Sequence, residues 1–161
     1  MKRFSKGAGI FLGLLVMLIP GLTVPFAHGA EIRIPPVTTQ SGQPVDILVK
    51  VQDVDNLAGV KLVMTFDPEI LTFKRGSKTE ATESLMHVIN DKKPGLLIVV
   101  MAGARGISGK DTEIFKLTFD TKGGLKENHT TKVEIKEAQL MSDQLREIKC
   151  GIVVSPVTIL P

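Results

Sequence analysis

Few side chains in this sequence are of a type, or at a spacing, that supports catalysis. After residue 30 the chain has two histidines, His87 and His129, in unrelated segments, and one cysteine, Cys150. A nucleophile needs a general base and an orienting group beside it, and no G-x-S-x-G turn leads into a helix here. Neighbouring carboxylates such as Asp53 and Asp55 are typical of turns rather than of an acid–base pair. The sequence therefore predicts no catalytic residues and a protein that is not an enzyme.

Metal and cofactor sites are equally poorly supplied. Two histidines and one cysteine cannot complete a zinc site within one chain. Asp53 and Asp55 are not part of a D-x-D-x-D-G loop with a closing glutamate, the pattern that binds calcium. The glycines Gly103, Gly106 and Gly109 are spaced as in a phosphate-binding loop, but a strand-like segment follows them instead of the helix such a loop requires. We expect no metal and no cofactor.

Charge and aromatic content exclude further classes of partner. Three of the 20 basic residues, and none of the 17 acidic ones, lie in the first 30 residues, so the remainder carries no net charge. An uncharged domain has no general attraction for nucleic acid or for anionic lipid. The chain has no tryptophan and no tyrosine, and only four phenylalanines follow residue 30. Stacking platforms for sugars or single-stranded bases are therefore scarce.

The N-terminal segment has the features of a secretory signal peptide. Residues 1–30 combine a basic start with an apolar run, and Ala27 and Gly29 suit the positions before a peptidase cleavage site. An uncleaved membrane anchor is the alternative, in which case the protein would be held at a membrane. We expect residues 31–161 to form one secreted domain, extracellular or periplasmic, or displayed at the cell surface. Cys150, which has no partner within this chain, is then either buried or an intermolecular thiol.

The rest of the chain alternates apolar and polar residues with the period of a β-strand. Between the alternating segments lie turn signals such as Asp67-Pro68 and Gly123-Gly124. Many short strands at this spacing predict an antiparallel β-sandwich or jelly roll. The predicted strands are residues 44–53, 58–66, 115–119, 132–136 and 152–159.

Two segments depart from this alternation. Residues 96–102 are apolar on both faces, so this strand is either covered on both sides or presents an apolar row to a partner. Residues 77–86 have the spacing of a capping box at Ser77 and Glu80, followed by Ala81, Leu85 and Met86 as a weak apolar side. We predict one short helix there, of one or two turns, in an otherwise all-β chain.

Three stretches together resemble the cohesin domain of bacterial and archaeal extracellular assemblies. The first, residues 56–71, ends a strand at Phe66-Asp67-Pro68 and continues to Leu71. The second, residues 95–109, is similar to the apolar cohesin strand with its exit rich in alanine and glycine. The third comprises residues 133–140 and 148–159, which match the last cohesin strands in spacing. The resemblance covers nearly all of residues 32–160.

The resemblance implies a nine-stranded jelly-roll sandwich without catalytic activity that binds a dockerin domain, calcium-loaded on the partner's side. In cohesins that hold dockerins, the open face of one sheet makes the contact. On this chain the resemblance places the following residues in that contact: Gly59, Lys61, Val63, Thr65, Ile98, Val100 and Gly103. Which alternate of residues 96–101 faces outward stays open, because a slip of one residue reverses it.

Three of these residues depart from the best-known cohesin subclass. Gly59 and Lys61 stand where that subclass has asparagine and aspartate, and Gly103 stands where it has an acidic residue. These departures argue against a dockerin of that subclass, and Lys61 indicates a partner that is either acidic or differently docked.

The leading hypothesis is therefore a secreted cohesin-like module that binds the dockerin of an exported polysaccharide-degrading enzyme. One alternative is direct carbohydrate binding on the related sandwich fold, which needs an exposed phenylalanine. Another alternative is a structural component of an envelope secretion or pilus apparatus.

Overall fold

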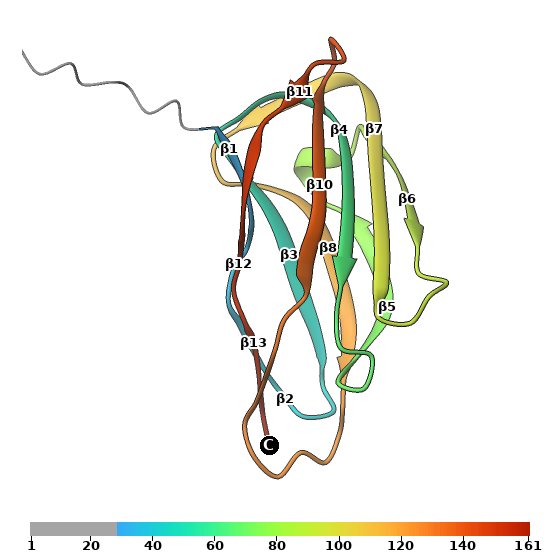
Figure 1. The fold of residues 1–161 in the computed structure, drawn as a ribbon, viewed down its shortest axis with the longest axis vertical. Coiled ribbons are helices and arrows are strands. Elements are labelled where there is room, and N and C mark those ends of the chain that lie inside the picture. Colours follow the sequence, from blue (N-terminus) through green and yellow to red (C-terminus); the bar gives the residue numbers. More distant parts are fainter. Residues whose placement is uncertain (1–28) are drawn as a thin grey trace, which may run out of the picture.

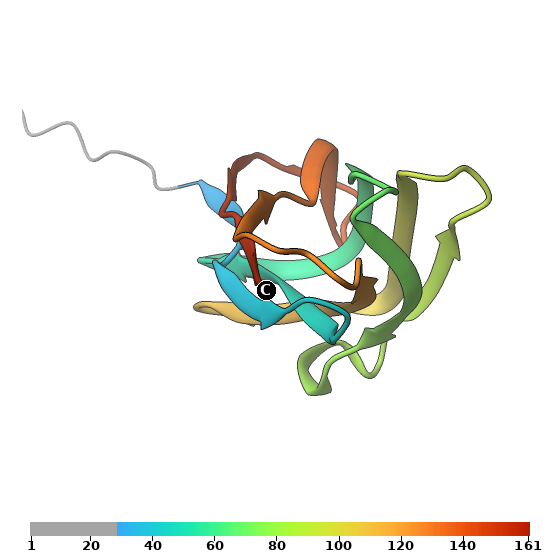
Figure 2. The same cartoon turned by 90° about the horizontal axis from the view of Figure 1, so that it is seen from below.

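The computed structural model describes residues 29–161, which form two β-sheets packed face to face (Figure 1, Figure 2). The predicted signal peptide therefore lies outside the described residues, apart from Gly29 and Ala30. Sheet I has the strand order β12 (Cys150–Val154), β1 (Ala30–Ile34), β3 (Pro44–Gln52), β8 (Thr112–Thr121) and β5 (Leu71–Lys78). Sheet II has the order β11 (Glu147–Ile148), β10 (Glu134–Ser142), β4 (Val54–Thr65), β7 (Leu96–Gly109) and β6 (Met86–Asn90). A small third sheet joins β2 (Val37–Gln40), β13 (Val157–Leu160) and β9 (His129–Thr131).

The prediction of an all-β jelly-roll sandwich is confirmed. All strand pairs are antiparallel except β1 with β12 and β2 with β13. Prolines interrupt both of the chain segments that pair in parallel, and they do so at the same level. Proline has no N–H to donate to the hydrogen-bond ladder between strands. Pro35 and Pro36 separate β1 from β2, and Pro156 separates β12 from β13. The single terminal strand predicted over residues 152–159 is for this reason two strands.

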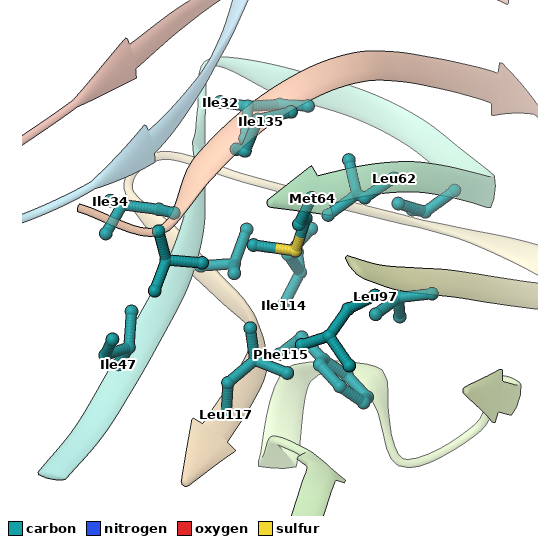
Figure 3. Packing of buried hydrophobic residues seen from close by; sticks show 14 of the residues in the cluster. Ile32, Ile34, Ile47, Leu62, Met64, Leu97, Ile114, Phe115, Leu117 and Ile135 are labelled. Atoms are coloured by element: carbon teal, nitrogen blue, oxygen red, sulfur yellow. The ribbon is translucent and has the colours of Figure 1, made fainter. Parts of the chain in front are cut away.

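The core lies between the two sheets and follows the alternation of the sequence (Figure 3). In the strands predicted over residues 44–53, 58–66 and 115–119, the apolar residues at every second position are buried, and the polar residues between them face solvent. Phe119 is fully buried, and its ring packs edge-on against Phe66 and Phe73, with centroid distances of 5.1 and 5.6 Å. The buried alternates of these strands are Val45, Ile47, Val49, Val51, Val60, Leu62, Met64, Phe115, Leu117 and Phe119.

The prediction of one short helical turn within residues 77–86 is confirmed, but its start and its N-cap differ from those predicted. β5 continues to Lys78, and a single 3₁₀ turn (Glu80–Thr82) follows, with Thr79 rather than Ser77 at its N-cap. The buried hydroxyl of Thr82 accepts a hydrogen bond from the Thr79 N–H (3.0 Å) and donates one to the Ile114 carbonyl of β8 (2.9 Å). The bond to Ile114 ties this single turn to sheet I, and β6 begins four residues later at Met86. Within residues 29–161, no helix could span a membrane.

Gly106 lies where β7 approaches β4 closely. This close contact explains the glycine at position 106, which in the sequence resembled part of a phosphate-binding loop. A Cβ on Gly106 would lie 2.5 Å from the backbone carbonyl carbon of Asn56, a residue whose φ is +58°.

We expect Gly106→Ala to lower the free energy of unfolding by about 2 kcal/mol, because the added methyl group would force the backbone to move. Urea denaturation checks this. Gly151→Ala, which meets only the Glu31 side chain at 3.9 Å, is the matched control. Equal midpoints for the two variants would contradict the prediction.

Candidate docking face

The outer face of sheet II presents side chains from β6, β7, β4 and β10, which lie side by side in Figure 1. The strand register settles which alternate of residues 96–101 faces outward: Leu97, Val99 and Met101 are buried in the core. The opposite alternates therefore lie on the outer face, and strand pairing aligns them in rows across the sheet. The upper row is Met86, Ala102, Gly59 and Met141; the middle row is Val88, Val100, Lys61 and Gln139; the lower row is Asn90, Ile98, Val63 and Glu137.

The half of this face formed by β6 and β7 is apolar and open to solvent. Met86 is 77% exposed and Val88 68%, both on the edge strand β6, and Val100 of the inner strand β7 is 42% exposed. Ile98 and Val63 lie beside them and are half-buried. Contiguous exposed apolar surface of this kind is typical of a protein–protein interface. The outer face of sheet II therefore has the character of a docking surface.

The charges on this face compensate each other. The Lys61 ammonium lies 2.8 Å from the Glu137 carboxylate of β10, and both side chains are about half exposed. An exposed pair of this kind contributes at most about 1 kcal/mol to stability. Its larger effect is that Lys61 is not an isolated cation, so the structure removes the main reason to expect an acidic partner.

Six of the seven residues in the predicted contact lie on the outer face of sheet II. Gly59, Lys61, Val63, Ile98 and Val100 belong to its three rows. Thr65 lies one row below, opposite Leu96 of β7 and Glu134 of β10.

Gly103 is the exception, and its assignment to the contact needs correction. It follows the outward-facing Ala102, so its Cα substituent would point to the inner side. A Cβ there would lie 2.4 Å from Cδ2 of the buried Leu85. Gly103 is thus a position of close packing rather than part of the outer face.

Sequence reasoning missed several residues of this face. Met86 was assigned to the apolar side of the predicted helix, and Val88 was assigned to no element; the structure places both residues in β6. Glu137 and Met141 could not be placed because nothing in the sequence specifies which residues of β10 lie opposite β4.

His87 and His129, the two histidines of residues 29–161, lie apart from this face and from each other. His87, on the inner side of β6, packs edge-on against Phe115 with a centroid distance of 5.4 Å. His129 pairs with Ile159 in the third sheet. Over the described part of the chain, no group of three or more histidine, cysteine or acidic side chains could hold a metal ion.

Cys150 is half-buried at the start of β12. Burial, and secondarily the Glu147 carboxylate, raise the pKa of its thiol. Because the thiolate is the reactive form, we expect alkylation of Cys150 at pH 8 to be several-fold slower in the folded protein than in urea. The rate in the folded protein should still be rising above pH 9. Equal rates in the folded and unfolded chain at pH 8 would contradict this.

The fold is a jelly roll, and its open apolar face is typical of a module that makes protein–protein contacts. The Cohesin domain family model matches residues 30–159, and the chain belongs to the cohesin family. This family is a non-catalytic interaction module, so the protein is not an enzyme, as the sequence predicts. No curated protein matches the chain.

Solved cohesins share this fold at low sequence identity. A non-cellulosomal cohesin from Archaeoglobus fulgidus is 14% identical, with a TM-score of 0.73 over 83% of this chain and 92% of that one. The sixth cohesin of scaffoldin B from Acetivibrio cellulolyticus, solved with a dockerin, is 18% identical, with a TM-score of 0.72 over 82% and 98%. A cohesin from a type I cohesin–dockerin complex of Clostridium thermocellum is 15% identical, with a TM-score of 0.70 over 83% and 94%.

Proposed function

We propose that this protein is a secreted cohesin module that binds a dockerin-type partner through the outer face of sheet II. The observation that carries the proposal is the exposed aliphatic cluster of Met86, Val88 and Val100 on the open sheet of a cohesin-family chain. Several solved relatives of the same fold are cohesin–dockerin complexes. The contact residues are those of the three rows, with Thr65 at their lower end.

The chemistry of this face favours an apolar contact over a network of polar groups. At its centre Gly59 offers no side chain, and Lys61 already donates to Glu137. Hydrogen bonds from these positions therefore contribute little to partner choice. Burial of exposed aliphatic surface supplies about 25 cal/mol for each Å² removed from water. The partner should accordingly dock through its own apolar surface.

The setting that fits this proposal is extracellular polysaccharide degradation, as in a cellulosome-like assembly. Residues 1–30 would export the module, and the partner's dockerin would carry the degrading enzyme. A single module of this kind cannot gather several enzymes by itself, so multivalency would need an anchor or an oligomer.

A pull-down from the secreted proteins of the source organism tests the proposal, with the full-length chain as bait and calcium present. The face variant is Val88→Asp/Val100→Asp, and the matched control is Ile152→Asp/Val153→Asp. Ile152 and Val153 of β12 are 43% and 42% exposed, and they lie on sheet I. Wild type and control should retain dockerin-bearing proteins, with loss on chelation of calcium, and the face variant should not.

Other outcomes of the pull-down would contradict the proposal. Calcium-independent retention of envelope proteins would favour the structural role in a secretion or pilus apparatus. Retention of polysaccharide without any protein would favour carbohydrate binding. Against that second alternative, all four phenylalanines of residues 29–161 are buried or half-buried, so none offers an open stacking platform.

A further inference from the structure

We propose that two copies of this chain associate through the free edge of β6, with the two β6 strands antiparallel about a two-fold axis at Val88. Sheet II then continues from one copy into the other as a single sheet. The contact uses the edge of sheet II rather than its outer face, and it requires no dockerin. The proposal rests on the open backbone of β6 and on the charges that lie before and after this strand.

The backbone of β6 is bonded on one side only. β6 is the last strand of sheet II, at the right-hand edge of Figure 1, and it pairs with β7 alone. In the described part of the chain, no turn or loop backbone bonds to residues 86–90. Every second residue of an antiparallel strand directs its N–H and C=O away from its partner strand. β6 therefore presents free donors and acceptors that another strand can bind.

The other edges of the two sheets have features that oppose such pairing. β5 has Lys74, Arg75 and Lys78, and its register with β8 shifts between Phe73 and Arg75. β11 has only two residues, and β12 lies close to β10 of the opposite sheet. β6 contains no lysine, arginine, carboxylate or proline, and its register with β7 has no shift. Charges, bulges and short length keep edge strands apart, so the contact is confined to β6.

A two-fold axis at Val88 pairs the whole of β6 with its copy. Val88 lies opposite Val88 of the second copy, and Met86 lies opposite Asn90 of the second copy. Paired residues are an even number of positions apart, so side chains of the outer face meet side chains of the outer face. Met86 and Val88 are largely exposed in the single copy, and the pairing covers part of both. Aliphatic contacts across an antiparallel pair stabilise it.

The two ends of β6 carry complementary charges. Glu80 and Glu83 lie before the strand, Lys92 and Lys93 lie after it, and all four are exposed. Among residues 29–161 none of these four forms an ion pair. When the register is continued beyond the strands, Lys93 of one copy comes opposite Glu83 of the other. The two-fold axis repeats this approach at the opposite end.

Two further charged side chains lie at these ends. Lys78 donates from its ammonium to the Glu83 carbonyl, and Asp91 directly follows β6. With them included, two carboxylates and one ammonium precede the strand, and two ammoniums and one carboxylate follow it. The two ends therefore keep opposite net charge. A parallel pairing would bring ends of like charge together, so the charges select the antiparallel arrangement.

An exchange of charge at the two ends tests the pairing. The first variant is Lys92→Glu/Lys93→Glu, and the second is Glu80→Lys/Glu83→Lys. Either variant alone places like charges against each other at both ends of the pair. A mixture of the two variants restores opposite charges at both ends. Because these side chains are exposed, both variants should unfold as wild type does.

Sedimentation equilibrium of the full-length chain gives the dissociation constant of the dimer. The matched control is Lys122→Glu/Lys126→Glu, which makes the same change of charge in the exposed segment between β8 and β9. Wild type and control should dimerise equally. The dissociation constant of each end variant alone should be at least tenfold higher, and that of their equimolar mixture should return to within threefold of wild type. Amide exchange of residues 86–90 should slow as the wild-type concentration rises.

Several results would overturn the dimer. These are a monomeric wild type at every concentration, end variants that dimerise as wild type does, a mixture that stays monomeric, and a dimer in which the amides of residues 86–90 exchange as in the monomer. None of these measurements uses a dockerin, so their outcome is independent of the proposed function.

Discussion

The double substitution Val88→Asp/Val100→Asp is expected to weaken dockerin binding by about 1,000-fold, which corresponds to about 4 kcal/mol. Val88 and Val100 are cross-strand neighbours in the middle row, and both are exposed in the free protein. In the complex they would be covered, so each aspartate would lose its water without a partner charge. Residues at the centre of an interface carry most of the binding energy, which is why two substitutions suffice. Isothermal titration with a dockerin from the pull-down gives the dissociation constants.

The folding of the face variant is tested separately from its binding. Because Val88 and Val100 project from the sheet into solvent, the variant should unfold within about 1 kcal/mol of wild type. The control Ile152→Asp/Val153→Asp should bind as wild type does. A face variant that folds and still binds within threefold of wild type would place the contact elsewhere on the molecule.

The largest expected effect on stability is that of Phe119→Ala, which should lower the free energy of unfolding by about 3–5 kcal/mol. The Phe119 side chain is fully buried in sheet I, and the Phe66 and Phe73 rings both pack edge-on against it. Its removal leaves a cavity and ends two aromatic contacts at once. Since a whole domain is stable by only about 5–15 kcal/mol, this change approaches the limit of folding.

Urea denaturation of Phe119→Ala and Phe119→Leu distinguishes the cavity from a general sensitivity of the site. Leucine keeps much of the apolar volume, so Phe119→Leu should lose clearly less stability than Phe119→Ala. A loss below about 1 kcal/mol for Phe119→Ala would mean that the site collapses around the cavity or that the rings do not pack as described.

The inner and outer faces of the central strands could be predicted because a strand alternates with a period of two residues. Once Val60, Leu62 and Met64 point inward, Lys61 and Val63 must point outward, whatever surrounds them. The same reasoning fails for residues 96–102, where both alternates are apolar and local sequence contains no preference. There the pairing of β7 with β4, in which Ile98 lies opposite Val63, makes the choice.

The residues that sequence reasoning missed or misplaced depend on contacts between distant segments. Glu137 reaches Lys61 only because β10 pairs with β4 in one particular register. The buried Thr82 hydroxyl ties the turn that precedes Met86 to β8, and a local capping pattern does not reveal such a bond. Gly103 was placed on the face by the cohesin resemblance, and the packing of Leu85 beside it shows why it does not belong there.

The most direct test of the dockerin-binding face is a methyl-resolved NMR titration of the protein with a calcium-loaded dockerin from the pull-down. The aliphatic residues Val63, Val88, Ile98 and Val100 report on the outer face of sheet II, and Ile152 and Val153 report on sheet I. We predict that the methyl signals of the first four shift on binding, that those of Ile152 and Val153 stay in place, and that chelation of calcium reverses the shifts. Shifts confined to Ile152 and Val153, or no shift at any of the six residues, would contradict the account.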